Sequence, residues 1–253
     1  IGEKNVVNTE TSMMQDIEVL QVAHAFLNSI GVLDHVTLEL NSLGSIEERN
    51  NYANDLKQFF REYQTDLSQE SQTRLKLAIE TNEIQNIWRI LDSKLEEDIR
   101  IITEHKAPLF SEYYTAETRE RFDALQETLR ELGIKYTVNP YLVRGLDYYS
   151  HTTFEFTSPI AATNNQPSRN VAVLAGGRYN DLFKMIGRDT VEAIGWAAGI
   201  ERLAILMEQL PEQTQKTNPT VGIIGMTGSD IDPKIKLTAL KLAQALRSST
   251  SIP

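Results

Sequence analysis

Four short runs in the second half of the chain alternate between apolar and polar residues, with no helix-forming segment between them. Such alternation is typical of β-strands. Consecutive strands without long crossover connections pair most readily as an antiparallel sheet. The sequence therefore predicts an antiparallel sheet whose last strand runs directly into an apolar helix over residues 200–210. The four runs are residues 134–139, 151–158, 170–177 and 192–199.

The first part of the chain adds one helix and one strand. Residues 13–30 place apolar side chains at helical spacing, and Gly31 stands where a helix would end. Residues 35–44 alternate like a half-buried strand, and Ser45 with Glu48 forms a capping box that opens the next helix. We expect the apolar face of the first helix to consist of Val19, Leu20, Val22, Ala23, Phe26, Leu27 and Ile30.

The middle of the chain has a helical pattern alone. From Tyr52 to Leu132 the sequence is rich in Glu, Gln, Lys, Arg and Leu, with a polar joint around Pro108. A helical block between two regions that contain strands indicates an α+β fold. Residues 211–219 form a polar linker bounded by prolines, and the strand and helix patterns over residues 220–249 predict the first βα unit of another domain.

Composition limits the class of protein. The 253 residues are 41% hydrophobic and carry a formal net charge of −10, so a broad basic face for nucleic acid is not expected. The chain has no cysteine, no apolar run long enough to span a membrane and no secretory signal pattern. We therefore expect a cytoplasmic protein with no membrane partner. Ile1 in place of methionine, and Pro253 within a connection-like stretch, lead us to expect a piece of a longer protein.

Three clusters of glycine and arginine lie where strands begin or end. Glycine lets a backbone approach a ligand closely, and the planar guanidinium suits phosphate and carboxylate oxygens. One such cluster alone is often a turn glycine beside a solvated arginine, but three in sequence on one sheet favour an anionic substrate. The clusters are Arg144 with Gly145, Gly176 and Gly177 with Arg178, and Gly195 and Gly199 with Arg202.

The segment LVRGLDYY, residues 142–149, admits two interpretations. In the first, Arg144 and Asp147 form a local ion pair while Tyr148 and Tyr149 pack as aromatic residues of the core. In the second, Arg144 faces the negative charge of a ligand and Asp147 holds the orientation of the arginine. The tyrosine hydroxyls then supply polar tips to an otherwise apolar pocket.

Two further segments are open in the same way. AGGRY can be a strand, a glycine turn and a helix start, or Gly176 and Gly177 can present backbone N–H groups to a ligand beside Tyr179. In GWAAGIERL the glycines can serve helix–sheet packing. Arg202, however, falls in the first turn of a helix that we expect to be buried, where a charge needs a partner such as a nucleotide phosphate.

Several common catalytic patterns are absent from the sequence. The four histidines are scattered without the spacing of metal ligands, so we propose no protein-built metal site. The sequence has no phosphate-binding loop of the GxxxxGK[ST] type, no dinucleotide-binding glycine pattern after a strand and no nucleophile elbow.

Read together, LVRGLDYY, AGGRY and GWAAGIERL resemble, in sequence and order, motifs of the histidyl-tRNA synthetases, which are class II aminoacyl-tRNA synthetases. The first two resemble the two histidine-recognition motifs of that family, and GIERL resembles class II motif 3. LELNSLGS and RILDSK are also similar to family stretches. The resemblance implies ATP-dependent activation of histidine to histidyl-adenylate and transfer to tRNA(His), with Mg²⁺ as cofactor and a homodimer as the complete enzyme.

The resemblance also implies roles for individual residues. Arg144 would be the catalytic arginine that contacts the α-phosphate of ATP and the carboxylate of histidine. Arg202 would hold the γ-phosphate, and Gly199 would let the adenine lie against backbone. The histidine pocket would be lined by Arg144, Tyr148, Tyr149, Tyr179 and Gly177.

The resemblance implies a division of the chain as well. Residues 1–60 and 121–210 would form a class II antiparallel sheet with flanking helices, and residues 61–120 a helical insertion domain. Residues 218–253 would begin an α/β anticodon-binding domain. Class II motifs 1 and 2 would precede residue 1, so we expect the 253 residues alone to be inactive.

Some residues depart from the family pattern, and other functions stay open. Asn180 stands where aspartate is common, Trp196 where phenylalanine is usual, and extra residues precede LDSK, which affects the geometry of the insertion. The main alternative is the synthetase-like, non-catalytic regulatory subunit of ATP phosphoribosyltransferase, which is expected to lack both the helical insertion and the unit after Pro219. A third is a synthetase-derived scaffold that binds no ATP.

Overall fold

The computed structural model describes residues 9–159, 170–189 and 191–210, together with positions 238, 241 and 242. The chain divides into two compact units, Ile1–Met207 and Glu208–Pro253. The expected linker at residues 211–219 lies outside the described residues, as does the expected βα unit apart from the three isolated positions. The α/β start of an anticodon-binding domain therefore stays a prediction.

Five strands form one sheet in the order β2-β1-β3-β4-β5. The pairs β1–β3, β3–β4 and β4–β5 are antiparallel, as the sequence predicts. The pair β1–β2 is parallel, so the prediction of a purely antiparallel sheet is wrong at this edge. The reason is the helical segment between these two strands, which acts as a crossover and returns the chain to the same end of the sheet. The strands are β1 (Thr37–Ser42), β2 (Thr137–Val138), β3 (Ser150–Ser158), β4 (Val171–Arg178) and β5 (Ile194–Ala198).

Strand register gives the sheet one apolar face and one face that carries polar side chains. Leu38 stands opposite Phe156 and Leu40 opposite Phe154, and all four side chains are buried. Because neighbouring residues of a strand point to opposite faces, the intervening Glu39 and Glu155 lie on the other side. The two glutamates are paired across β1 and β3. The apolar face is the core side, and the face with the glutamates carries polar and small side chains.

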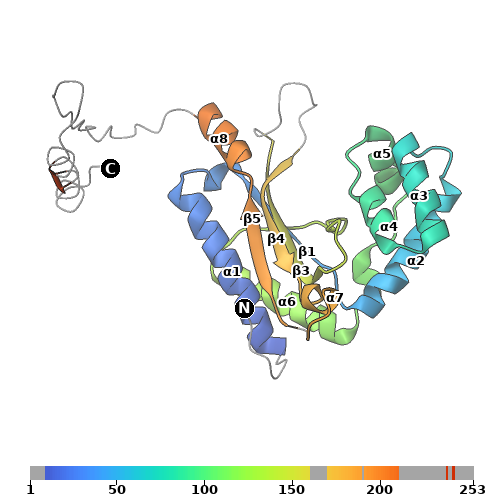
Figure 1. Cartoon of the computed structure of the whole chain (residues 1–253), viewed down its shortest axis with the longest axis horizontal. Coiled ribbons are helices and arrows are strands. Elements are labelled where there is room, and N and C mark those ends of the chain that lie inside the picture. Colours follow the sequence, from blue (N-terminus) through green and yellow to red (C-terminus); the bar gives the residue numbers. More distant parts are fainter. Residues whose placement is uncertain (1–8, 160–169, 190, 211–237, 239–240, 243–253) are drawn as a thin grey trace. The chain divides into compact units, whose positions relative to one another are not determined.

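Helix α1 (Thr9–Ser29) packs against β4, β5 and helix α6 (Ala116–Glu131) (Figure 1). Its buried stripe follows Ile17, Leu20, Ala23 and Leu27. Val22 is 55% exposed, so its predicted place on the apolar face is wrong. The true stripe has the expected spacing of three and four residues but is rotated to exclude Val22.

The predicted helical segment is a cluster of four α-helices, α2 to α5, that share one apolar core (Figure 1). They are α2 (Ile46–Glu62), α3 (Gln69–Thr81), α4 (Ile84–Leu91) and α5 (Glu96–Glu104), followed by the 3₁₀ turn η2 (Phe110–Tyr113). Val143 belongs to the same core, and Tyr149 packs against it, although both lie far along the chain, just before β3. The core of this helical block therefore extends to the segment before β3. Helices α2 and α6 run across residues 60 and 120, where the sequence places domain boundaries.

Three further elements lie within the described residues. They are the 3₁₀ turn η1 (Leu33–His35), helix α7 (Leu182–Met185) and helix α8 (Ile200–Gln209). The sequence predicts that α8 is buried, but only one side of it is: Leu203 and Leu206 are buried, whereas Ile200 is 77% exposed.

The predicted capping box at the start of α2 is confirmed. The Ser45 hydroxyl accepts from the Glu48 backbone N–H at 3.3 Å, and the Glu48 carboxylate accepts from the Ser45 N–H at 2.5 Å. The same carboxylate accepts from the Thr115 N–H at 2.6 Å and the Thr118 hydroxyl at 2.9 Å, which cap α6. Burial alone would raise the pKa of Glu48, but these hydrogen bonds outweigh burial and the pKa is lowered. One carboxylate thus joins two helix N-termini.

A buried charge cluster centred on Asp16 joins α1, α6, β3 and β4. Both Asp16 and Arg178 are fully buried. One carboxylate oxygen of Asp16 accepts from Arg178 Nε at 2.9 Å and Nη2 at 2.6 Å. The other accepts from Arg121 Nη2 at 2.8 Å and the Thr152 hydroxyl at 2.6 Å. Arg178 is therefore committed to the interior, and its predicted place in a glycine–arginine cluster facing substrate is wrong.

The Asp16 cluster predicts a large effect of a small substitution. Asp16→Asn removes the charge that compensates two buried guanidinium groups, and we expect it to lower the free energy of unfolding by about 3–5 kcal/mol. Urea denaturation followed by circular dichroism measures the change. Glu18→Gln, at an exposed position on the same helix, is the matched control and should change stability little. An Asp16→Asn variant as stable as the control would contradict the central role of this carboxylate.

Candidate functional site

Small residues cover part of the glutamate-bearing face of the sheet. Ala175 and Gly177 of β4 are paired with Ala197 and Gly195 of β5. Across β3, Ala175 is paired with Glu155. Since these four residues carry a methyl group or no side chain, they form a flat floor beside the Glu155 carboxylate. A floor of this kind leaves room for a ligand or for large side chains from neighbouring loops.

Three tyrosines gather over this floor. The ring centroids of Tyr148 and Tyr149 are 5.0 Å apart, and each lies 6.4 Å from the ring of Tyr179 with nearly perpendicular planes. A methyl group added at Gly177 would lie 3.1 Å from Tyr149 Cδ1, and one added at Gly195 would lie 3.3 Å from the Tyr179 hydroxyl. The two glycines therefore let the rings rest on the sheet. The predicted meeting of the three tyrosines is found.

Arg144 joins the tyrosine cluster. Its guanidinium carbon lies 5.4 Å from the centroid of the Tyr149 ring, within the range of a cation–π contact. Its Nη1 donates to the Glu155 carboxylate in an ion pair whose side chains are 22% and 20% exposed. The predicted partner, Asp147, is not the one used, because the Asp147 carboxylate instead accepts from Gln85 Nε2 of α4. The arginine is thus oriented by the sheet, and the aspartate ties the loop to the helical block.

Two acidic side chains face each other beside the arginine. Glu39 and Glu155 are directly opposite across β1 and β3. Burial raises the pKa of Glu155, while the positive charge of Arg144 acts in the opposite direction. Glu39 accepts from Asn139 Nδ2 at 2.6 Å and from the Thr157 hydroxyl at 2.9 Å.

Burial also raises the pKa of Tyr148, so its phenol stays protonated at neutral pH and can donate a hydrogen bond.

The two glycines of AGGRY are strand residues, which corrects the predicted glycine turn. Both lie inside β4, and both are paired to β3 and β5. Gly177 faces the tyrosines, whereas a methyl group at Gly176 would lie 2.7 Å from Trp196 Cβ and 2.8 Å from Phe154 Cζ. Gly176 therefore gives space to the core, where the Trp196 ring also stacks on Phe26 with centroids 5.5 Å apart.

Arg202 lies against Gly199, the other residue predicted to bind ATP, because a methyl group added at Gly199 would lie 3.4 Å from Arg202 Cδ. It is exposed, and its Nη1 donates to the Ala172 carbonyl at 2.6 Å. Ala172 lies three residues before Ala175, the partner of Glu155 across the sheet, a separation of about 10 Å along β4 at the usual rise per residue. The expectation of a buried Arg202 is wrong, because only the other side of α8 is covered. Gly199, just before α8, donates its N–H to the Val173 carbonyl at 2.9 Å.

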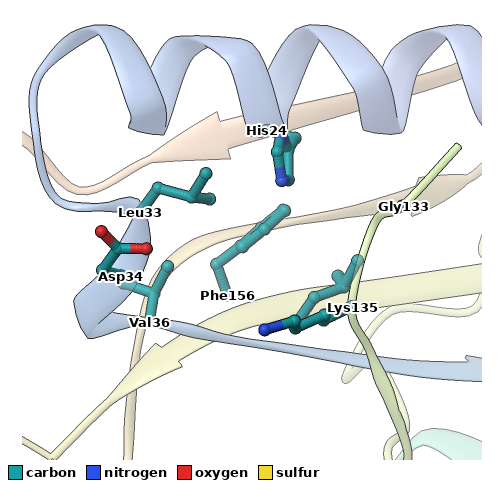
Figure 2. Close-up of a pocket in the computed structure, with 8 residues that line it drawn as sticks. His24, Leu33, Asp34, Val36, Gly133, Lys135 and Phe156 are labelled. Carbon is teal, nitrogen blue, oxygen red and sulfur yellow. The ribbon is translucent and has the colours of Figure 1, made fainter.

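A separate cavity of about 330 Å³ lies on the apolar side of the sheet (Figure 2). Leu38 and Phe156 belong to the face opposite Glu39 and Glu155. None of the predicted site residues lines this cavity. It is lined by His24, Leu33, Asp34, Val36, Leu38, Gly133, Lys135 and Phe156.

A metal site and a membrane-spanning helix are two further possibilities for the described part of the chain. There, no group of three or more histidine and acidic side chains is placed to hold a metal ion. His151 has its pKa lowered to about 4 by burial and by the nearby charges of Arg121, Arg178 and Arg49, so it is neutral at physiological pH. No helix within the described ranges is both long enough and apolar enough to cross a bilayer.

Comparisons with known proteins identify the family of the chain. The family model of histidyl-tRNA synthetase matches residues 7–203. Histidine–tRNA ligase of Orientia tsutsugamushi (strain Ikeda) is 44% identical over 208 residues, which cover 80% of this chain and 45% of that protein. The Gluconobacter oxydans (strain 621H) ligase is 43% identical over 202 residues, covering 79% of this chain and 45% of that protein. The chain thus spans about half the length of these curated relatives.

A solved structure shows the same fold. The crystal structure of apo S. aureus histidyl-tRNA synthetase aligns with a TM-score of 0.57 and 27% identity, covering 98% of this chain and 54% of that one. The mixed sheet with flanking helices is therefore that of a class II aminoacyl-tRNA synthetase. Within that class, the chain belongs to the histidyl-tRNA synthetase family.

The structure also adds residues that the sequence analysis missed. Glu155 pairs with Arg144, Gln85 donates to Asp147, and Arg49 pairs at 2.9 Å with Asp181, two residues after Tyr179. A signal for Glu155 was present in the sequence, since a glutamate between two phenylalanines of a strand must face away from the core. Gln85 and Arg49 lie far along the chain from their partners, and no local pattern identifies them.

The floor predicts unequal effects of adding one methyl group. In Gly177→Ala the new carbon would lie 2.7 Å from the Thr152 carbonyl oxygen as well as against Tyr149. We expect a loss of about 1–3 kcal/mol in the free energy of unfolding and a displaced Tyr149 ring. Gly145→Ala is the matched control, because no atom lies within 4 Å of the added carbon. Thermal denaturation of both variants tests this, and equal stabilities would contradict it.

Proposed function

We propose that this chain forms the histidine-binding part of a histidine–tRNA ligase, which activates histidine with ATP and transfers it to tRNA(His). The observation that carries the proposal is the meeting of Arg144, Tyr148, Tyr149 and Tyr179 over the glycine and alanine floor. The relatives that match most of this chain bear the name histidine–tRNA ligase, which supports the same assignment.

The chemistry of the site suits an amino acid that carries a ring with nitrogen atoms. Phenol hydroxyls can exchange hydrogen bonds with an imidazole, and the rings provide apolar walls. A pocket built to bind ring nitrogens rejects a purely apolar ring strongly, because its own polar groups would be left unpaired. Arg144 would hold the carboxylate of the bound histidine and stabilise negative charge when that carboxylate attacks the α-phosphate of ATP.

The proposal includes two ATP-binding residues. Arg202 for the γ-phosphate and Gly199 for the adenine follow from the resemblance to motif 3, and the two residues lie against each other. The described residues form no metal-ligand cluster, so Mg²⁺ would come to the site bound to ATP. The ion, when bound, would neutralise phosphate charge on the incoming ATP. We also propose that the complete enzyme is a cytoplasmic homodimer and that tRNA(His) is its partner.

The alternative function, a regulatory subunit of ATP phosphoribosyltransferase, is less well supported. Helices α2–α5, whose core is continuous with the segment before β3, are a feature which that paralogue is expected to lack. A synthetase-derived scaffold that binds no ATP would have the same fold, so an ATP-binding experiment is needed to distinguish it from the ligase.

Ligand binding by the chain itself tests the proposal. We expect isothermal titration calorimetry to detect histidine binding and to detect no binding of phenylalanine at matched concentrations, because phenylalanine cannot satisfy the polar groups of the pocket. Tyr179→Phe should weaken the binding of histidine. Tyr136→Phe, whose hydroxyl bonds Arg130 and the Gln126 carbonyl outside the site, is the control and should bind normally. Equal affinity for histidine and phenylalanine would contradict the proposal.

Catalysis by these 253 residues is expected to be absent, because the chain spans about half the length of its relatives. Histidine-dependent exchange of pyrophosphate into ATP measures adenylate formation directly. We expect no exchange above background with this chain, and exchange with a form extended to the full length of the relatives. Robust turnover by the 253 residues alone would show that they contain a complete activation site.

A further inference from the structure

We propose that Glu155 is a positioning residue, whose carboxylate fixes the Arg144 guanidinium over the sheet floor in the orientation that receives the substrate carboxylate. The inference rests on the proposed function for the role of Arg144. The contact itself is a property of the structure.

The need for a positioning group arises from where Arg144 is attached. It lies between the end of β2 and the start of β3, in a segment without regular secondary structure. Arginine has many rotamers, and a loop gives its guanidinium no fixed direction. A group that must meet developing charge works best when it is already held in place.

Glu155 provides a rigid support. It lies in the middle of β3, which is paired on both sides, with β1 and β4. The Tyr149 ring supports the guanidinium through a second contact. Only Nη1 of Arg144 is used in the bond to Glu155, and a guanidinium has five N–H donors. Donors on its remaining nitrogens are therefore available to a carboxylate or phosphate.

The placement of Glu155 is unfavourable unless the arginine is present. Like charges directly opposite on neighbouring strands destabilise a sheet, and Glu155 faces Glu39. Glu39 has hydrogen bonds from Asn139 and Thr157, whereas the bond shown for Glu155 comes from Arg144. Partial burial adds to the cost of the Glu155 charge. A charge kept at such a position is explained if its function is to hold the guanidinium.

The first measurement needs no ligand. In ¹⁵N NMR spectra of the free chain, rotation of the Arg144 guanidinium about its Nε–Cζ bond should be slow in the wild type and fast in Glu155→Gln. Glu39→Gln is the matched control, since it removes the facing carboxylate of the same pair and leaves the contact with Arg144 intact. Unchanged slow rotation in Glu155→Gln would overturn the proposal, whether or not the chain binds histidine.

The second measurement connects the contact to function. Histidinol lacks the carboxylate of histidine, so the ratio of their dissociation constants reports what Arg144 contributes. We expect Glu155→Gln to reduce the preference for histidine about tenfold while leaving histidinol binding unchanged. Adding Glu155→Gln to Arg144→Gln should have no further effect on the ratio, because both act through one guanidinium.

The outcomes separate this inference from the proposed function. Equal weakening of both ligands by Glu155→Gln would indicate a merely structural role and would overturn the inference. Failure of the wild type to bind histidine would contradict the proposed function, and the NMR comparison would still decide whether Glu155 holds Arg144. Circular dichroism of each variant confirms that the fold is retained.

Discussion

The carboxylate of Asp16 is the contact on which the fold of the first unit most depends. It compensates two buried guanidinium groups, and its partners come from α6, β3 and β4. A buried charge is tolerated only when it is paired and fully hydrogen-bonded, so these elements must meet in one arrangement. Thr152 and Arg178, which bind this carboxylate, lie on the strands that carry Glu155 and Gly177. The position of the candidate site is therefore set by the charge cluster behind it.

The two faces of the sheet carry different side chains, and this difference explains how a site can form on one of them. The apolar face packs Leu40 and Phe154 in the core, while the other face offers glycine and alanine. Large side chains over that second face come from outside the strands, from the segment before β3 and from Tyr179 after β4. The sheet contributes rigidity and one carboxylate, and the neighbouring segments contribute the groups that can contact a ligand.

Sequence reasoning succeeded where the signal is local. The strand alternation around Leu38 and Phe156 and the capping box at Ser45 depend on residues a few positions apart, and both are confirmed. It failed where partners are distant. Arg178 has the same local surroundings as a ligand-binding arginine, and only the packing of α1 brings Asp16 to it. Similarly, Asp147 is three residues from Arg144, but the folded chain offers Glu155 to the arginine and Gln85 to the aspartate.

The continuity between the helical core and the segment before β3 has a mechanical consequence. Val143 and Tyr149 are held by the same apolar cluster as Tyr52 and Trp88. A force that tilts the helices would thus reach the aromatic wall beside Arg144, formed by Tyr148 and Tyr149, through this shared apolar cluster. Trimming the helices away to obtain a minimal sheet would leave that wall facing water. The helical block therefore supports the aromatic wall and shields it from water.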